Sequence, residues 1–234
     1  MRAKAALKLA CTPLAKYSAL MLLRETNTQC FYSLLREDLE ELLPTLYTPT
    51  VGDACLAWGS LLPRPTGLYI SYDQHRDRLK EVVAAWPESQ VKIAVITDGN
   101  RILGLGDLGA HGMGIPVGKA TVYGACGVDP RWILPVQVDV GCNTASVRDD
   151  PLYLGDRRSR LPDEEYYPFM HQVVQAIQER YGFGTLMHWE DVSSKHSFGL
   201  LELLRAAEVT TFNDDIEATA VISLAALLGA VKVP

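Results

Sequence analysis

Leucine side chains recur at helical spacing through residues 1–45, and few turn-forming residues interrupt them. This pattern predicts a helical N-terminal segment. Asn27 and Thr28 are expected to cap its second helix, and Pro44 is expected to end it, because proline cannot donate the next backbone hydrogen bond. A leucine-rich face of this kind is most often core, and it can also serve as an interface between subunits.

A turn rich in proline and glycine follows at residues 63–67, and it is expected to lead into the short strand LYISY. A helix is predicted over residues 73–86, with Pro87 ending it. From Val91 onward apolar runs alternate with helical stretches, and this rhythm predicts an α/β fold with a mostly parallel sheet and helices on both faces. The expected strands cover 91–97, 132–140, 185–189 and 209–212, and the expected helices cover 116–126, 163–180, 196–207 and 216–230.

The composition narrows the classes of function. Hydrophobic residues make up 48% of the 234 residues, enough for a substantial core. The net charge of −6 and the lack of a basic stripe argue against a nucleic-acid partner. No run approaches the 18 apolar residues of a membrane span, so no membrane segment is expected. The five cysteines form no CxxC motif and are odd in number, which suits reduced thiols in a reducing compartment.

Residues 1–23 carry four basic side chains and no acidic one. A mitochondrial transit peptide can have this composition, and so can a basic amphipathic helix or a chain that begins inside a longer protein. We favour the last two interpretations. The expected location is the cytoplasm or the mitochondrial matrix, with the cytoplasm slightly favoured.

Seven glycines lie within residues 97–119, between a predicted strand and a predicted helix opened by Pro116. They allow backbone to approach backbone or ligand closely, although a plain connecting loop also uses glycine. Lys119 is placed in the first turn of that helix, where the helix dipole disfavours an ammonium. This placement suits a lysine that must sometimes lose its proton.

The same stretch holds a formal GxGxxG at residues 104–109, with Asp129 where an acid that binds a ribose could lie. A dinucleotide site requires a helix that begins inside the glycines, and here the helical pattern begins later, at Ile115 and Pro116. We therefore interpret this match as coincidental.

Acidic residues follow each of the predicted strands, where the carboxyl ends of parallel strands share one edge of the sheet. About half of them are expected to cap helices. The others repel one another, and a divalent cation with oxygen ligands, Mg²⁺ or Mn²⁺, would relieve that repulsion. The five histidines show no ligand spacing and are expected to be structural or exposed. The acids are Asp98, Asp139, Glu190, Asp191, Asp214 and Asp215.

Several long motifs give the chain a close resemblance to the malic enzymes of the large eukaryotic type, from about residue 30 to the C-terminus. The resemblance implies the α/β fold of the malic-enzyme N-terminal domain, which is amino-acid-dehydrogenase-like. The motifs are YTPTVG at 47–52, VITDG at 95–99, RILGLGDLG at 101–109, GMGIPVGK at 112–119, DPLYLG at 150–155, the acidic pair at 190–191 and FNDDI at 212–216.

The resemblance implies a role for each matching residue. Tyr47 is the implied general acid, Lys119 the general base, and Arg101 the group that holds a malate carboxylate. Asp214 is implied to lie beside the lysine and to tune its charge. The implied ligands of Mn²⁺ or Mg²⁺ are Glu190, Asp191 and Asp215, and Asp215 also faces the cofactor.

The implied reaction is the oxidative decarboxylation of L-malate to pyruvate and CO₂ with reduction of NAD or NADP, in a homo-oligomer, either a dimer or a tetramer. The family usually has Gln and Gly where this chain has Glu217 and Ala218, and Phe where it has Trp189 and Val192. None of these changes removes an implied ligand.

The family continues into a nucleotide-binding domain, whereas this chain ends at Pro234. We therefore expect a fragment that is inactive alone, with three regions. They are a helical N-terminal region with the Tyr47 loop (1–90), an α/β substrate and metal domain (91–215), and the start of a nucleotide-binding domain (216–234). The alternative is a non-catalytic oligomerisation or regulatory module derived from such an enzyme.

Overall fold

The N-terminal region is helical, as the leucine pattern predicts. The computed structural model describes residues 2–231 and the side chains of residues 4–231. The Asn27 side chain caps α3, because its oxygen accepts a hydrogen bond from the Cys30 backbone N–H at 2.9 Å. Pro44 does not end the helix as expected, but lies inside α4 and removes one backbone hydrogen bond from it. The helices of this region are α1 (Arg2–Leu9), α2 (Pro13–Thr26), α3 (Thr28–Glu37), α4 (Leu39–Leu46) and α5 (Thr50–Leu56).

Five strands form one sheet in the order β1-β3-β2-β4-β5, and every neighbouring pair is parallel. This confirms the predicted α/β fold. Strand β1 belongs to the sheet, although it lies within residues 1–90, the region expected to be helical. The expected boundary at residue 90 therefore does not separate the helices from the sheet. The strands are β1 (Leu68–Ser71), β2 (Ile93–Thr97), β3 (Ile133–Asp139), β4 (Leu186–Trp189) and β5 (Thr211–Asn213).

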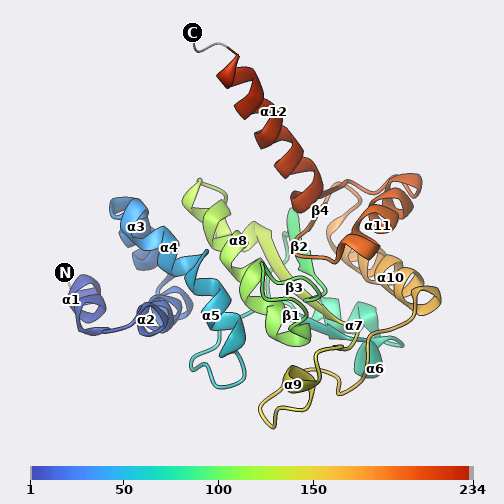
Figure 1. The fold of residues 1–234 in the computed structure, drawn as a ribbon, viewed down its shortest axis with the longest axis horizontal. Coiled ribbons are helices and arrows are strands. Elements are labelled where there is room, and N and C mark those ends of the chain that lie inside the picture. The colour runs from blue at the N-terminus through green and yellow to red at the C-terminus, as the bar shows by residue number, and fades with distance from the viewer. Residues whose placement is uncertain (1, 232–234) are drawn as a thin grey trace.

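Helices cover both faces of the sheet (Figure 1). Alternate strand residues such as Leu134 and Val136 pack with α7 (Leu79–Ala84), α10 (Asp163–Tyr181) and α11 (Ser194–Ala206). Ile133 faces the other way, toward α8 (Gly114–Ala125). The N-terminal helices form a second core beyond α8. The period of two along a strand thus separates the two packed faces.

The single helix predicted over residues 73–86 is wrong, since the chain forms α6 (Tyr72–His75) and then α7. Ser71 caps the start of α6. Its hydroxyl accepts from the Gln74 N–H at 3.0 Å, and its own backbone N–H donates to Nδ1 of His75 at 3.0 Å. These bonds fix where α6 begins, and the chain then leaves the helix at residues 76–78 before α7 begins.

The remaining short elements lie in the connections. They are a 3₁₀ turn (Gly109–Met113), a second 3₁₀ turn (Pro130–Trp132) and α9 (Ala145–Arg148). None of the helices in the described part of the chain combines the length and the apolar character that a membrane span requires.

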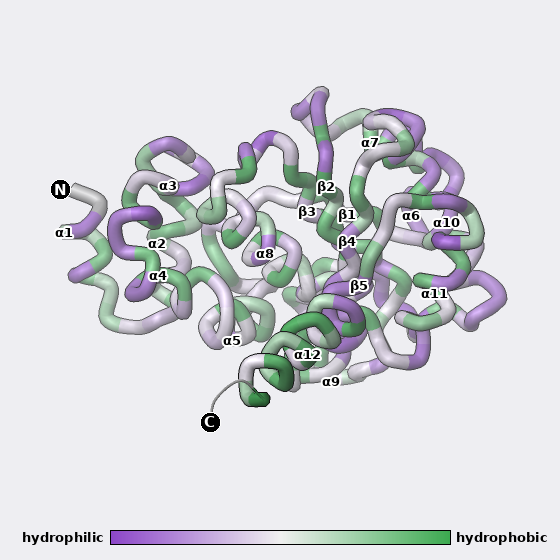
Figure 2. The backbone as a smooth tube through the Cα atoms, turned by 90° about the horizontal axis from the view of Figure 1, so that it is seen from above, coloured by the Kyte–Doolittle hydropathy of each residue, from purple (hydrophilic) through white to green (hydrophobic). Residues whose placement is uncertain are grey.

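The C-terminal helix α12 (Thr219–Ala230) projects away from the body of the chain (Figure 1). A π-helical turn, Asp214–Ala218, connects it to β5. The helix is mainly hydrophobic (Figure 2), yet its apolar side chains do not pack on the chain's own core, and Leu227 is 67% exposed. Residues 232–234 of the third expected region lie outside the described residues, as does the expected strand start at Pro234.

Candidate active site

The glycine-rich loop after β2 is folded back on itself and fastened to the segment after β4. Gly99 has φ +71°, and a Cβ there would overlap the carbonyl oxygen of Gly109, so the turn requires glycine. The Arg101 N–H donates to the backbone oxygen of Asp191 at 3.1 Å, and the Leu103 N–H donates to Asp191 Oδ2 at 3.1 Å. The loop therefore brings Arg101 beside the acidic pair that follows β4.

Lys119 contacts two carboxylates from distant segments. Its Nζ lies 2.9 Å from Oδ2 of Asp214 and 3.1 Å from Oε1 of Glu190. The helix begins at Gly114, so Lys119 lies in its second turn rather than its first, and the expected effect of the helix dipole is weak there. Burial lowers the pKa of Lys119, but the two carboxylates raise it more, so its pKa lies above the ordinary value. Lys119 is thus held as a cation in this arrangement.

The hydroxyl of Tyr47 donates to the same oxygen of Glu190 at 2.9 Å. Its ring lies against α8 at Gly118, where a Cβ would come within 2.6 Å of the Tyr47 ring. Burial, and then the charge of Glu190, raises the pKa of the Tyr47 hydroxyl well above its ordinary value. Tyr47 therefore keeps its proton and remains a possible donor.

Glu190 is buried and receives hydrogen bonds at both carboxylate oxygens. Oε1 is shared by Tyr47 and Lys119, and Oε2 lies 2.7 Å from Nε2 of His188. The other ring nitrogen of His188 lies 2.7 Å from the hydroxyl of Tyr123. Burial raises the pKa of Glu190, but the contacts with His188 and Lys119 lower it by more, so the pKa lies below its ordinary value. Glu190 is therefore held as a carboxylate.

His188 belongs to the site, although the sequence interpretation set the histidines aside. A signal was present. His188 and Glu190 are two residues apart at the end of β4, and in a strand residues two apart point to the same face. This two-residue relation is the signal in the sequence that places His188 beside Glu190.

Asp191 and Asp215 lie together next to Glu190. Oδ2 of Asp215 accepts from the Asp191 N–H at 3.0 Å, and Asp191 itself has φ +54°. Burial raises the pKa of Asp191 to about 7, and the neighbouring charges of Asp215 and Glu190 raise it too. Such a crowded, buried group of carboxylates is suited to a divalent cation with oxygen ligands.

A second group of possible ligands overlaps the first. Within residues 2–231, donor atoms of His188, Glu190 and Asp214 lie within 4.8 Å of one another. The ammonium of Lys119 already neutralises Glu190 and Asp214 in this group. The implied trio of Glu190, Asp191 and Asp215 does not meet the same 4.8 Å distance in the described residues, and it shares Glu190 with this group. Asp191 and Asp215 differ from Asp214 in having no cation partner among the described ion pairs.

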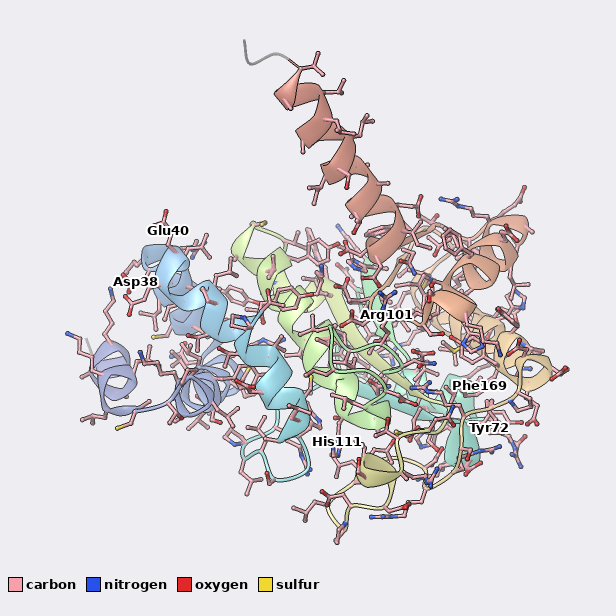
Figure 3. All side chains as sticks on the ribbon, in the orientation of Figure 1. Asp38, Glu40, Tyr72, Arg101, His111 and Phe169 are labelled. Carbon is pink, nitrogen blue, oxygen red and sulfur yellow. The ribbon has the colours of Figure 1, made fainter. Side chains whose placement is uncertain are left out.

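The side chain of Arg101 is exposed, and its guanidinium makes no hydrogen bond or ion pair with any other residue in the described range. Figure 3 shows Arg101 near the centre of the view, on the loop beside α8. A planar guanidinium with free donors can hold a carboxylate through two hydrogen bonds.

Two of the acids grouped by sequence lie outside this cluster. Asp98 is fully buried, 3.4 Å from the guanidinium of Arg160, and it accepts from the Tyr166 hydroxyl at 3.0 Å. Asp139 accepts backbone hydrogen bonds from Gly141 and Asp156. Both stabilise connections near the strand ends, so the expected single group of acids is divided into structural and site members.

The GxGxxG match has no dinucleotide geometry. Asp129 pairs with Arg131 at 2.6 Å and caps a 3₁₀ turn before β3, at the amino end of the strand. The carboxyl ends, where ligands bind in such sheets, are at the opposite edge. The structure agrees with the interpretation of this match as coincidental.

Comparison with known proteins gives consistent results. The family profile "Malic enzyme, N-terminal domain" matches residues 24–205. Among curated relatives, NADP-dependent malic enzyme 4, chloroplastic, of Arabidopsis thaliana is 46% identical over 221 residues, which cover 94% of this chain and 34% of the relative. NADP-dependent malic enzyme of Phaseolus vulgaris is also 46% identical over 221 residues, 94% of this chain and 37% of the relative. The chain thus spans about a third of the length of these relatives.

A third relative, NADP-dependent malic enzyme, chloroplastic, of Flaveria pringlei, is 44% identical over 221 residues, 94% of this chain and 34% of the relative. Two of these three names specify the chloroplast, so the expected cytoplasmic or mitochondrial location is contradicted.

Among solved structures, the crystal structure of Entamoeba histolytica malic enzyme matches with a TM-score of 0.44 and 23% identity. The match covers 81% of this chain and 31% of that one. At that score the likeness adds nothing to the assignment. The profile match and the identities to the curated relatives show that the chain belongs to the malic enzyme family, as its N-terminal domain.

Proposed function

We propose that this chain carries the substrate-binding and acid–base residues of an NADP-dependent malic enzyme, which converts L-malate and NADP⁺ into pyruvate, CO₂ and NADPH. One observation carries the proposal. The hydroxyl of Tyr47 and the Nζ of Lys119 meet at one oxygen of Glu190, at 2.9 Å and 3.1 Å. The proposed acid and the proposed base thus both contact one carboxylate oxygen. The names of the curated relatives support NADP over NAD.

Lys119 accepts the proton of the malate 2-hydroxyl while hydride leaves C2 for the nicotinamide. The C4 carboxylate then leaves as CO₂, and Tyr47 donates a proton to C3 of the resulting enolpyruvate. The raised pKa of Tyr47 suits a group that keeps its proton until that step. The carboxylates of Glu190 and Asp214 hold Lys119 as a cation. Lys119 therefore becomes a base only when those carboxylates are paired with another group.

Arg101 holds a malate carboxylate, since its guanidinium is exposed and free on the loop beside the acidic pair. Glu190, Asp191 and Asp215 hold Mn²⁺ or Mg²⁺. When bound there, the cation polarises the substrate hydroxyl and offsets developing negative charge. Asp214 sets the charge state of Lys119 through its contact with Nζ at 2.9 Å.

Three broader points belong to the same proposal. The chain has regions 1–90, 91–215 and 216–234, with strand β1 of the first region paired into the sheet of the second. The exposed apolar face of α12 packs on further protein in a homo-oligomer, a dimer or tetramer. A plastid location is supported by the names of two relatives. The 234 residues alone do not turn over malate, because hydride transfer requires a nicotinamide held against C2.

The test uses a full-length enzyme that contains this chain, assayed for NADPH formation from malate with Mn²⁺. Lys119→Ala should block malate oxidation, and Tyr47→Phe should chiefly slow the protonation of enolpyruvate, each by about 10²–10⁴-fold. Lys195→Ala is the matched control, because Lys195 is exposed and pairs only with Asp163. Turnover of both variants within a few-fold of the control would contradict the roles. A full-length wild-type protein that forms oligomers but does not turn over malate would favour the non-catalytic alternative.

A further inference from the structure

His188 has a place in the site that the proposed chemistry does not use. It is fully buried in β4, and both ring nitrogens bond to side chains. Nδ1 lies 2.7 Å from the Tyr123 hydroxyl, and Nε2 lies 2.7 Å from Oε2 of Glu190. The rings of Tyr123 and Phe212 flank the imidazole, with centroids 5.6 Å and 4.5 Å away. The orientation of the imidazole is therefore determined by four contacts.

The partners of His188 also determine where its hydrogen lies. A carboxylate only accepts hydrogen bonds, so Nε2 carries a hydrogen and donates it to Glu190. With one hydrogen on the ring, Nδ1 is an acceptor, and the O–H of Tyr123 donates to it. This single tautomer satisfies both nitrogens and the Tyr123 hydroxyl.

The two oxygens of the Glu190 carboxylate have different partners. Oε2 is tied to the imidazole, which leaves Oε1 facing Tyr47 and Lys119. The last torsion of a glutamate side chain is broad and roughly two-fold, so the carboxylate does not hold one orientation by itself. Without His188, the contacts of Oε1 with Tyr47 and Lys119 remain, but nothing among the described hydrogen bonds fixes Oε2, so the plane of the carboxylate is less well defined.

We propose that His188 is a positioning residue that fixes the carboxylate plane of Glu190, and that Tyr123 fixes the tautomer of His188 in turn. The proposal rests on the proposed function, because it gives Glu190 its place as a cation ligand beside the acid and base. Partners that hydrogen-bond a ligating carboxylate typically change metal affinity or activity by about 10–100-fold when removed.

The first experiment measures Mn²⁺ affinity of the 234-residue chain by electron paramagnetic resonance titration. His188→Ala should bind Mn²⁺ about 10–100-fold more weakly than the wild type. His188→Gln should recover most of the affinity, because its amide N–H can still donate to Glu190. The matched control is His196→Gln, another buried histidine, whose partners are Asp163 and Ser193 outside the site. Affinities of His188→Ala and the control that agree within twofold would overturn the proposal.

The second experiment needs no metal and reads the tautomer by ¹H–¹⁵N NMR of the histidine rings. The wild-type chain should show His188 with a hydrogen on Nε2 that exchanges slowly with water, and Glu190→Ala should abolish that slow exchange. Tyr123→Phe should shift the Nδ1 resonance, since its acceptor bond is lost. A hydrogen on Nδ1 alone would overturn the proposal.

The two experiments separate this inference from the proposed function. If Glu190→Gln and Asp191→Asn bind Mn²⁺ as the wild type does, or if the wild type binds none, the metal assignment is wrong. The ring tautomer then decides the role of His188 by itself: a protected Nε2 hydrogen supports the positioning of Glu190, and an Nδ1 hydrogen contradicts it.

Discussion

The ammonium of Lys119 lies 2.9 Å from a carboxylate oxygen of Asp214, although the two residues are 95 positions apart in the chain. Asp214 follows β5 at the start of the π-helical turn, and Lys119 lies in α8. The contact makes the charge of the proposed base depend on a residue that directly follows the edge strand β5. Lys119 is held as a cation until that contact and the one with Glu190 change.

Replacing Asp214 by Asn should lower the pKa of Lys119, because an anion that favours the ammonium is removed. The neutral fraction of Lys119 at pH 9 should rise about three- to tenfold. Acylation of the chain by a small amine-reactive reagent, followed residue by residue by mass spectrometry, measures this change. Lys80 is exposed and serves as the internal control. An unchanged rate at Lys119, relative to Lys80, would contradict the prediction.

Asp139 should make the chain less stable as pH rises from about 4 to about 6. Burial raises its pKa to about 6 in the folded chain, above its ordinary value of 3.8. The folded chain therefore binds the proton more tightly than the unfolded chain, and the stability gained at low pH is lost as pH rises through the folded pKa. Between pH 4.5 and pH 6.5 the free energy of unfolding should fall by about 2 kcal/mol from this group.

Urea unfolding of the wild type and of Asp139→Asn at those two pH values tests the contribution of Asp139. The variant should lose less stability between them than the wild type. Asp77→Asn removes an exposed carboxylate and is the control. Parallel losses in the wild type and Asp139→Asn would show that Asp139 does not titrate in this window.

Arg160→Met should destabilise the chain by about 3–5 kcal/mol, because it leaves buried carboxylates without their cation. Arg160 lies 3.4 Å from Asp98 and 2.7 Å from Asp107, and its own side chain is 5% exposed. The free energy of urea unfolding measures the effect. Arg36→Met changes an exposed arginine of α3 and should shift stability by less than about 0.5 kcal/mol. Equal effects of the two substitutions would argue against a stabilising role for this ion cluster.

Gly118→Ala should destabilise the chain even though alanine favours helices more than glycine does. An added Cβ would lie 2.6 Å from the ring of Tyr47, and crowding of this kind costs about 1–3 kcal/mol. At Gly104 a Cβ would meet nothing within 4 Å, so Gly104→Ala is the control. Thermal unfolding of both variants measures the difference. If Gly118→Ala proved more stable than the wild type, Tyr47 would have room to move at this contact.

Much of the fold could be predicted because its signals are local. The apolar runs that became β2, β3 and β4 are buried on both faces, and such strands have continuous hydrophobic sequences. The helix over 73–86 was wrong for a local reason of another kind. Ser71 and His75 fix the start of α6, but the chain leaves the helix at residues 76–78 before α7 begins, and apolar periodicity does not reveal that interruption.

The candidate site could be predicted only as a set of residue types. The acidic residues that follow each predicted strand indicated one edge of the sheet. The family motifs assigned roles to Tyr47 and Lys119. The separation of Asp98 and Asp139 from the other acids depended on Arg160 and on backbone donors near Asp139. The path of the loops decides which of these partners come near each acid, and the periodicity of apolar residues does not describe that path.

The sequence by itself determined the elements, their order along the chain and the glycines that the turn after β2 requires, because those properties arise between residues close in the chain. The tertiary structure alone decided that Tyr47 shares an oxygen of Glu190, 143 positions away, and that His188 holds the other oxygen. It also decided that Lys119 is a cation, since that depends on burial and on the distances to Glu190 and Asp214. Charge states and hydrogen-bond partners follow from distances through space, and these exist only once the sheet has brought its carboxyl ends together.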